Sequence, residues 1–245
     1  MKNTKFVFTF FFSFLFLLHI TNSVLAQEES EKKISYGIKV GTTLSNFSSE
    51  QPHNNYKPGL IAGCFITYKL SSNIALQMEP SYMQQGGNLI KIFDPAVLSI
   101  PDYPFALEIE DQKILFHNID IPLLFKYDKI IGGLKVFAVV GPSLGINIHT
   151  TAKTDVSARS KDIIPVYYDF YKEENITSNI NLLQYGVTGG LGFETRIRRN
   201  LPLIFDVRYR YSLNKTYEGY SYLGIHQIQG DLSSNTIYIT LGIGF

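Results

Sequence analysis

The sequence has little cysteine, no tryptophan and little charge, and these shortages exclude several classes of protein. Cys64 is the only cysteine among 245 residues, so the chain forms no internal disulfide and no cysteine-based zinc cluster. Lysine and arginine total 22 and aspartate and glutamate total 21, which leaves no basic excess to attract nucleic acid. Charged residues make up 18% of the chain and aromatic residues 14%, a mixture that favours short strands and tight turns over helices.

A long apolar run occurs only near the N-terminus. Two lysines precede an apolar run from Phe6 to Ile20, and Val24 and Ala26 occupy the positions that a signal peptidase recognises. This order is typical of a secretory signal peptide that is cleaved after Ala26. The alternative is an uncleaved membrane anchor, but a run of about 15 residues is shorter than the roughly 20 that span a bilayer. We therefore predict a signal peptide at 1–26, a short periplasmic segment at 27–34 and one domain at 35–245.

The mature chain consists of segments in which apolar residues alternate with other residues, the pattern of β-strands with one apolar face. The clearest segment places Leu203, Phe205 and Val207 on one face, with Asp206 and Arg208 on the other. Eight such segments are predicted, at 35–44, 58–70, 74–85, 114–127, 134–148, 182–197, 203–213 and 235–245.

The connections between these segments are alternately short and long. Those after the second, fourth and sixth segments contain a few residues, whereas the others contain about 14 to 35, as in transmembrane barrels with short periplasmic turns and longer external loops. An even number of strands also places both ends of the barrel on the periplasmic side. We therefore predict an all-β fold, an eight-stranded antiparallel up-and-down transmembrane β-barrel in the bacterial outer membrane.

The same alternation also fits a soluble periplasmic β-domain, in which the apolar face would be the core. Segments of about ten residues or more favour the membrane, because they match a tilted bilayer span. Tyrosines at the segment ends suit an interfacial girdle. The last segment remains apolar to its end. We expect the barrel-assembly machinery to recognise that segment through its apolar face, formed by Ile237, Ile239, Leu241, Ile243 and Phe245.

In a membrane barrel, the charged residues that alternate with the apolar ones point into the lumen. Ten residues are predicted there: Lys39, Lys69, Glu79, Asp120, Lys126, Glu194, Arg196, Asp206, Arg208 and Arg210. Eight strands enclose a lumen just wide enough to be filled by side chains. These basic and acidic groups can therefore pair as a plug that stabilises the lumen. The alternative is a narrow or gated polar path, which would make the protein a porin-like channel for small solutes.

Several stretches resemble a known family. They are Asn118–Lys126 (NIDIPLLFK), Gly141–Gly145 (GPSLG) and Gly186–Glu194 (GVTGGLGFE). Over essentially its whole mature length, the chain is similar to the PorT-like outer-membrane β-barrel family of Bacteroidetes-type bacteria. The resemblance implies an eight-stranded outer-membrane barrel. Because the name-giving member is linked to type IX protein secretion, it also implies an alternative role as an accessory component of a secretion system.

No arrangement of residues in the sequence predicts catalysis, a metal or a cofactor. The stretch Gly189–Gly192 superficially resembles a phosphate-binding loop, but it lies within a predicted strand and opens no helix. We interpret it as a place where a bulky neighbour or the curvature of the barrel requires small residues. The histidines are scattered, without the i, i+4 spacing of a metal motif. His117 is the one candidate for a lipid-modifying enzyme, and no complete set of catalytic partners accompanies it.

The longest connection contains an aromatic and acidic stretch, Val166–Glu174. Tyr167, Tyr168, Phe170 and Tyr171 are therefore candidates for contact with an external protein or glycan. The alternative is that this stretch is an extended strand tip. The function predicted from the sequence is a structural or interaction scaffold without catalysis. It would display long external loops from the outer membrane, with outer-membrane lipid as a partner.

Overall fold

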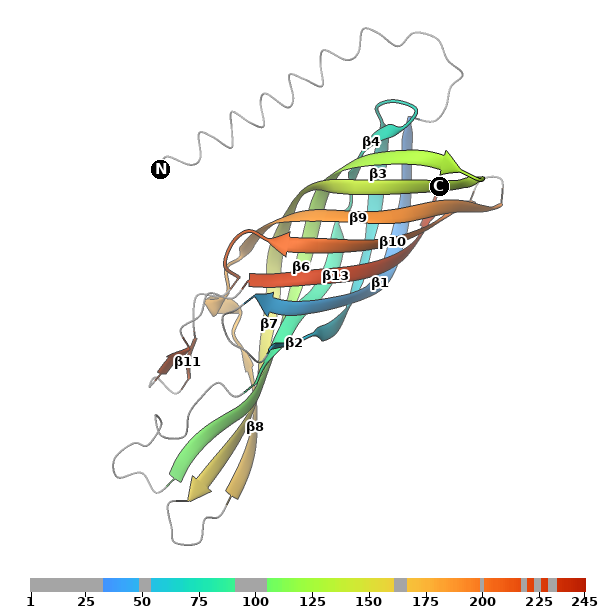
Figure 1. Cartoon of the computed structure of the whole chain (residues 1–245). Coiled ribbons are helices and arrows are strands. Elements are labelled where there is room, and N and C mark those ends of the chain that lie inside the picture. Colours follow the sequence, from blue (N-terminus) through green and yellow to red (C-terminus); the bar gives the residue numbers. More distant parts are fainter. Residues whose placement is uncertain are drawn as a thin grey trace, which may run out of the picture. The chain divides into compact units, whose positions relative to one another are not determined.

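The computed structural model describes residues 33–48, 54–90, 105–160, 167–198, 201–216, 220–222, 226–228 and 233–245. The predicted signal peptide at 1–26 lies outside the described residues, as does the predicted periplasmic segment except for its last two residues. Residues Ile34–Phe245 form one compact unit, a β-sheet that closes into a ring (Figure 1). Among the described residues, no helix has the length and hydropathy needed to cross a membrane.

The wall of the ring consists of strands that follow one another in sequence. They are β1 (Ile34–Ser48), β3 (Lys57–Lys69), β4 (Ile74–Met78), β5 (Ser81–Ile90), β6 (Phe105–Ile131), β7 (Leu134–Ser160), β9 (Leu183–Arg198), β10 (Leu201–Ser212) and β13 (Ser233–Gly244). Smaller elements are β2 (Asn54–Asn55), β8 (Tyr167–Asn175), the 3-10 helix η2 (Thr177–Asn179), and a hairpin of β11 (Tyr220–Tyr222) and β12 (His226–Ile228).

Strands β4 and β5 together form a single barrel strand. Both pair with β3 and with β6 in one unbroken register. The interruption at Glu79 and Pro80 arises because proline has no backbone N–H to donate. Backbone hydrogen bonds still bridge it, from Cys64 to the Pro80 carbonyl (3.1 Å) and from Glu79 to the Pro122 carbonyl (3.2 Å). The ring therefore has eight strands, as predicted.

Each strand pairs antiparallel with the next, and β13 pairs with β1 to close the ring. Paired residues followed once around the ring from Ile34 return to β1 at Leu44, ten residues further along. This stagger is what tilts the strands of a closed barrel by about 35–45° from its axis. The fold is thus an up-and-down barrel with no free edge in its wall.

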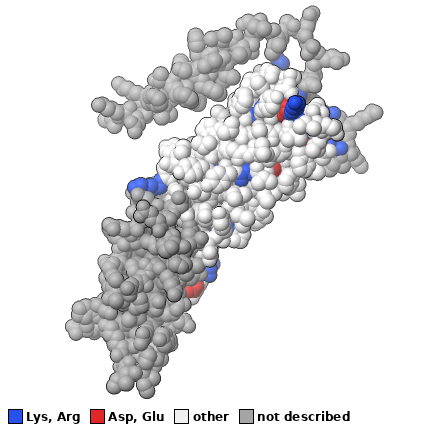
Figure 2. Space-filling view, in the orientation of Figure 1, with Lys and Arg blue, Asp and Glu red and all other residues white. Residues whose placement is uncertain are grey.

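The apolar face of each strand lies on the outside of the barrel. Ile38, Val40 and Leu191 are 55%, 59% and 67% exposed, whereas Arg208 and Arg210 are each 1% exposed. In the face seen in Figure 2, the described surface between the two ends is almost free of charge. A soluble domain would have the reverse arrangement, so the assignment of faces made for a membrane barrel is correct.

Aromatic side chains gather at the two ends of the wall. Tyr36, Tyr68 and Tyr127 are exposed at the end that carries the short turns, here called the turn end. The ring of Phe245 lies 6.0 Å from that of Tyr36. Other tyrosines, among them Tyr185, are exposed towards the opposite end, here called the loop end. This is the distribution of the two aromatic girdles of membrane barrels.

Strands β6 and β7 are 27 residues long and extend past the barrel wall at the loop end. There β8 pairs with the far part of β7, from Thr151 to Arg159, so that three strands form an extension (Figure 1). The predicted strand limits at 114 and 148, and the predicted long loop up to 181, are therefore wrong. Apolar and polar residues do not alternate regularly through this part of the chain, which is why the sequence pattern missed it.

Candidate functional site in the barrel lumen

The centre of the lumen holds two cations and two anions in direct contact. The Lys39 Nζ lies 2.8 Å from Glu79 Oε1 and 2.7 Å from Asp206 Oδ2. The Arg208 Nη2 donates to the same two carboxylates, at 2.8 and 3.0 Å. Thr240 also donates to Asp206, at 2.7 Å. All four charged groups are buried and their formal charges cancel, which is the condition under which burying them is tolerable. We call these four residues the central network.

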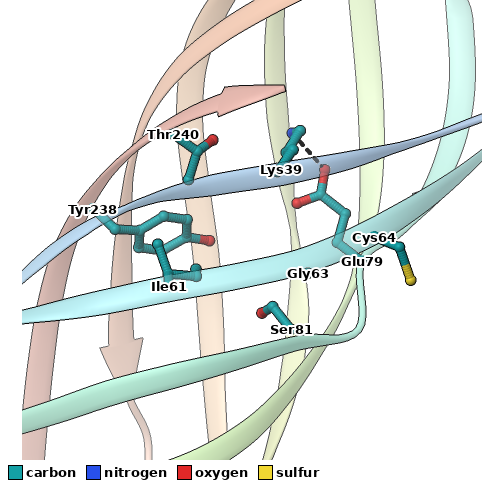
Figure 3. A pocket seen from close by; sticks show the side chains of 8 residues that line it. All are labelled: Lys39, Ile61, Gly63, Cys64, Glu79, Ser81, Tyr238 and Thr240. Atoms are coloured by element: carbon teal, nitrogen blue, oxygen red, sulfur yellow. Dashed lines mark hydrogen bonds and ion pairs between the residues drawn. The ribbon is translucent and has the colours of Figure 1, made fainter. Parts of the chain in front are cut away.

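The positions of these side chains follow from strand parity. Lys39 belongs to β1, Glu79 to the junction of β4 and β5, and Asp206 and Arg208 to β10. Each is buried and alternates with apolar neighbours that are more exposed, so all four point inward. Figure 3 shows Lys39 and Glu79 directed towards one another from separate strands.

A second ion pair lies next to the central network, on its loop-end side. Arg210 Nε donates to Asp120 Oδ1 at 2.9 Å, and its other nitrogens donate to Ser212 Oγ (3.0 Å) and to the Gln184 carbonyl (3.4 Å). Arg210 and Asp120 are both buried, one on β10 and the other on β6. The pair thus links β10 to β6, which lies three strands away around the ring.

A group of buried amides, which the sequence analysis did not single out, fills the next part of the lumen. Asn118 donates to the side-chain oxygens of Gln85 (2.6 Å) and Gln184 (3.2 Å), and accepts from Asn147 at 2.8 Å. Gln85 in turn donates to Thr236 at 2.9 Å. These residues occupy the same inward positions as the charges, so the alternation itself was the signal that could have found them.

Apolar side chains lie on both sides of the polar part of the lumen. Towards the turn end, one cluster of buried residues consists of Phe65, Leu124, Phe137, Val139 and Ile204. Towards the loop end, Phe47 packs edge-on against Phe116, with 5.8 Å between ring centroids, and Ile114 is also fully buried. The polar groups therefore lie between two apolar layers.

The space that remains beside the central network is small. A cavity of about 10 Å³ is lined by Lys39, Ile61, Gly63, Cys64, Glu79, Ser81, Tyr238 and Thr240 (Figure 3). That is about the smallest cavity that can hold one water molecule. Cys64 contributes little to it, because its side chain points away and is exposed.

A third group of charges lies at the turn end. Lys135 is 2.9 Å from Asp128 and 3.8 Å from Glu194, and Lys126 is 3.9 Å from the same glutamate. The Lys126 ammonium also lies 4.2 Å from the centre of the Phe137 ring, a cation–π contact.

Two of the residues predicted in the lumen lie at this same end, outside its buried part. Lys69 is half-buried at the last position of β3, and Arg196 is exposed near the end of β9. Both have the inward parity of their strands. However, they lie beyond the apolar cluster at the turn end, so the lumen assignment of Arg196 is corrected to an exposed rim position.

The predicted loop-contact residues Tyr167, Tyr168, Phe170 and Tyr171 all belong to β8 and not to a loop. Tyr171 is 61% exposed, and its hydroxyl donates to Glu173 at 3.2 Å. Glu173 also lies 3.2 Å from Lys153 on β7, and the hydrogen bond between them raises the pKa of the Lys153 ammonium. The extension thus exposes an aromatic residue beside a paired charge.

Comparison with known proteins agrees with this architecture. A family model described as "Outer membrane protein beta-barrel domain" matches residues 25–218, more than half of the chain. No curated protein sequence matches. The chain resembles the solved structure of OprG from Pseudomonas aeruginosa, with 12% identity, coverage of 88% of this chain and 98% of that one, and a TM-score of 0.46. For Ail, the attachment invasion locus protein of Yersinia pestis, the values are 12%, 86%, 98% and 0.38.

Proposed function

This chain belongs to the family of outer-membrane protein β-barrel domains, and we propose that it serves there as a closed scaffold that conducts no solute and displays its long strands and loops outside the cell. The observation that carries the proposal is the filled lumen. Between the apolar cluster around Phe137 and the aromatic contact of Phe47 with Phe116, the cross-section is occupied by paired charges and amides. An eight-stranded barrel leaves no room for a second path beside them.

Conductance across a planar lipid bilayer tests this proposal. The refolded protein should insert without producing current steps. The double variant Arg208→Ala, Arg210→Ala should also remain silent, because both apolar layers are still present. Insertion is checked by the mobility shift between unboiled and boiled samples on a denaturing gel. Steady current through the parent protein that changes in the double variant would overturn the scaffold proposal in favour of the narrow, porin-like channel.

The partners of the scaffold form part of the same proposal. The outward side chains of β13 from Ile237 to Ile243, together with Phe245 directly after the strand, would present the signal that the barrel-assembly machinery recognises. Outer-membrane lipid would cover the apolar wall. The extension of β6, β7 and β8, with Tyr171 exposed, would contact a protein or glycan outside the cell.

The finer resemblance to the PorT-like family suggests a second role, as an accessory component of protein secretion. Two of the stretches that carry this resemblance, Asn118–Lys126 and Gly141–Gly145, contain the buried residues Asp120 and Ser143, and Asp120 pairs with Arg210 inside the barrel. The ion pair with Arg210 gives Asp120 a structural role that requires no secretion partner. A strain that lacks this protein and still exports its cargo normally would exclude the second role.

A further inference from the structure

Two histidines from different strands are placed side by side by one β-bulge. Between β6 and β7 the register shifts next to His117, so that Asn118 lies opposite Asn147 but His117 lies opposite His149. The extra residue on β7 is Ile148. Without it, residue 149 would share the inward face of Asn147. Instead, Ile148 and His149 are both exposed, and the alternation resumes with Thr150 buried.

The bulge therefore turns His149 to the outer surface of the barrel, beside His117 near the loop end. The centroids of the two imidazole rings are 5.6 Å apart, and their planes are inclined by 46°. Metal-bound imidazole nitrogens lie about 2.0–2.1 Å from the ion. At the observed ring separation, one nitrogen from each ring can reach the same ion. Bulges commonly redirect a side chain in this way beside functional sites.

Neighbouring polar groups on β5 hold the His117 ring in place. Its Nδ1 is hydrogen-bonded to the Tyr82 hydroxyl. That hydroxyl accepts a hydrogen bond from Gln84 Nε2 at 3.1 Å, and Gln84 Oε1 accepts one from the backbone N–H of Leu60 at 3.2 Å. With Nδ1 engaged by Tyr82, Nε2 is the nitrogen left to bind an ion. A histidine held through its other nitrogen is the usual arrangement of a metal ligand.

We propose that His117 and His149 form an open site for a divalent transition-metal ion, Cu²⁺ or Zn²⁺, on the outer surface of the barrel. Imidazole is a preferred ligand of both ions. Among the described residues, no cluster of three or more histidine, cysteine or acidic side chains is placed to hold a metal. The ion would therefore keep positions open for water or for an external ligand. This site is independent of the closed lumen and goes beyond the scaffold function.

Titration of the refolded, untagged full-length protein with Cu²⁺ tests the site, using calorimetry and electron paramagnetic resonance. One Cu²⁺ per chain should bind, with spectral splitting from two imidazole nitrogens. Tyr82→Phe should weaken binding about tenfold, the lower end of what loss of a supporting hydrogen bond costs. His117→Ala and His149→Ala each remove a ligand and should weaken binding further. His226→Ala, which changes a histidine on β12, is the matched control and should leave the affinity unchanged.

Every variant must first show the heat-dependent mobility shift of the folded barrel, and because both histidines are on the outer surface, their replacement should not prevent folding. Equal affinity in the parent protein, His117→Ala and His149→Ala would overturn the proposal. So would the absence of saturable binding to the parent, since the pair would then be only part of the polar girdle at the membrane surface. Loss of conductance or of cargo export is not a readout of this experiment, so its failure is distinct from that of the scaffold proposal.

Discussion

At the scale of single residues, Glu79 is the centre of the lumen network. Its carboxylate accepts hydrogen bonds from Lys39, Arg208 and Gln77. Glu79→Ala would leave two buried cations facing only Asp206. Removing one partner of a buried ion pair leaves the other charge buried, where water cannot solvate it. We therefore expect the free energy of unfolding to fall by about 3–5 kcal/mol. Urea titration in detergent, followed by the gel mobility shift, measures it.

Glu173→Ala is the control for this prediction. Glu173 pairs with Lys153 at 3.2 Å, a separation similar to those of the central network, but both side chains are more than two-fifths exposed. Water screens the pair, so its removal should hardly change the urea midpoint. If both variants lost the same free energy of unfolding, burial of the network around Glu79 would not be what makes that residue important.

Replacement by alanine should have different effects on stability at two glycines of β9 that are only three residues apart. A Cβ on Gly192 would overlap the Phe137 ring and lie 2.7 Å from the Asp206 Cβ, so a side chain in the lumen must move. A Cβ on Gly189 would meet nothing closer than 3.7 Å. Gly192→Ala should therefore cost about 1–3 kcal/mol through overpacking. Gly189→Ala should leave the urea midpoint close to that of the parent. Comparable midpoints for both variants would contradict this account.

The residue scale also shows how far parity alone can predict a site. Alternation predicts that Lys39, Asp206 and Arg208 point into the lumen, because each is flanked by apolar residues, and all three are buried in the structure. It cannot say where the lumen stops along the strand, which is why Arg196 was assigned to it. Alternation also does not predict a β-bulge, so nothing in the sequence indicated that His149 points outward.

At the scale of elements, the sequence predicted the membrane-facing part of every strand but not the extension at the loop end. Lipid imposes one apolar face, and that constraint ends where the strand leaves the bilayer. Strands β6, β7 and β8 continue beyond that point through backbone pairing, to which side-chain contacts such as the ion pair of Lys153 with Glu173 are added. The sequence pattern also did not predict the break between β4 and β5 at Pro80, because the alternation of side chains continues through it unchanged.

The extension should be dispensable for closure of the barrel. Ala152 on β7 and Glu174 on β8 are register partners, so residues 153–173 can be replaced by an Asn-Gly turn. The pairing of β7 with β9, which begins at Ile146 and Leu183, is left untouched. The shortened protein should refold and retain its heat-dependent mobility shift. If it fails to refold while the full chain succeeds under the same conditions, the extension is part of the folding unit.

At the scale of the whole molecule, one physical requirement explains both the closed ring and the outward position of the apolar faces, which in a soluble domain would point inward. In hydrocarbon, every backbone N–H and C=O must be paired within the protein, so a membrane sheet must have no edge. Closing the sheet with its apolar faces outward leaves the polar faces enclosed in a lumen too narrow for bulk water. The charges must then pair with one another, as Lys39 and Arg210 do with their carboxylate partners. The filled lumen is thus a consequence of the small ring.

This requirement gives a prediction that depends on membrane depth. Val207 and Leu213 point outward from the same stretch of chain and are 41% and 62% exposed, but Val207 lies within the wall whereas Leu213 lies just past the end of β10. In lipid vesicles, Val207→Arg should cost about 2–4 kcal/mol and Leu213→Arg about 0–1 kcal/mol, because an arginine at the bilayer centre is far more costly than one at its surface. If water surrounded the barrel, both changes would be nearly neutral, since both side chains are exposed. Urea unfolding of the two variants in vesicles therefore distinguishes a wall immersed in lipid from one immersed in water.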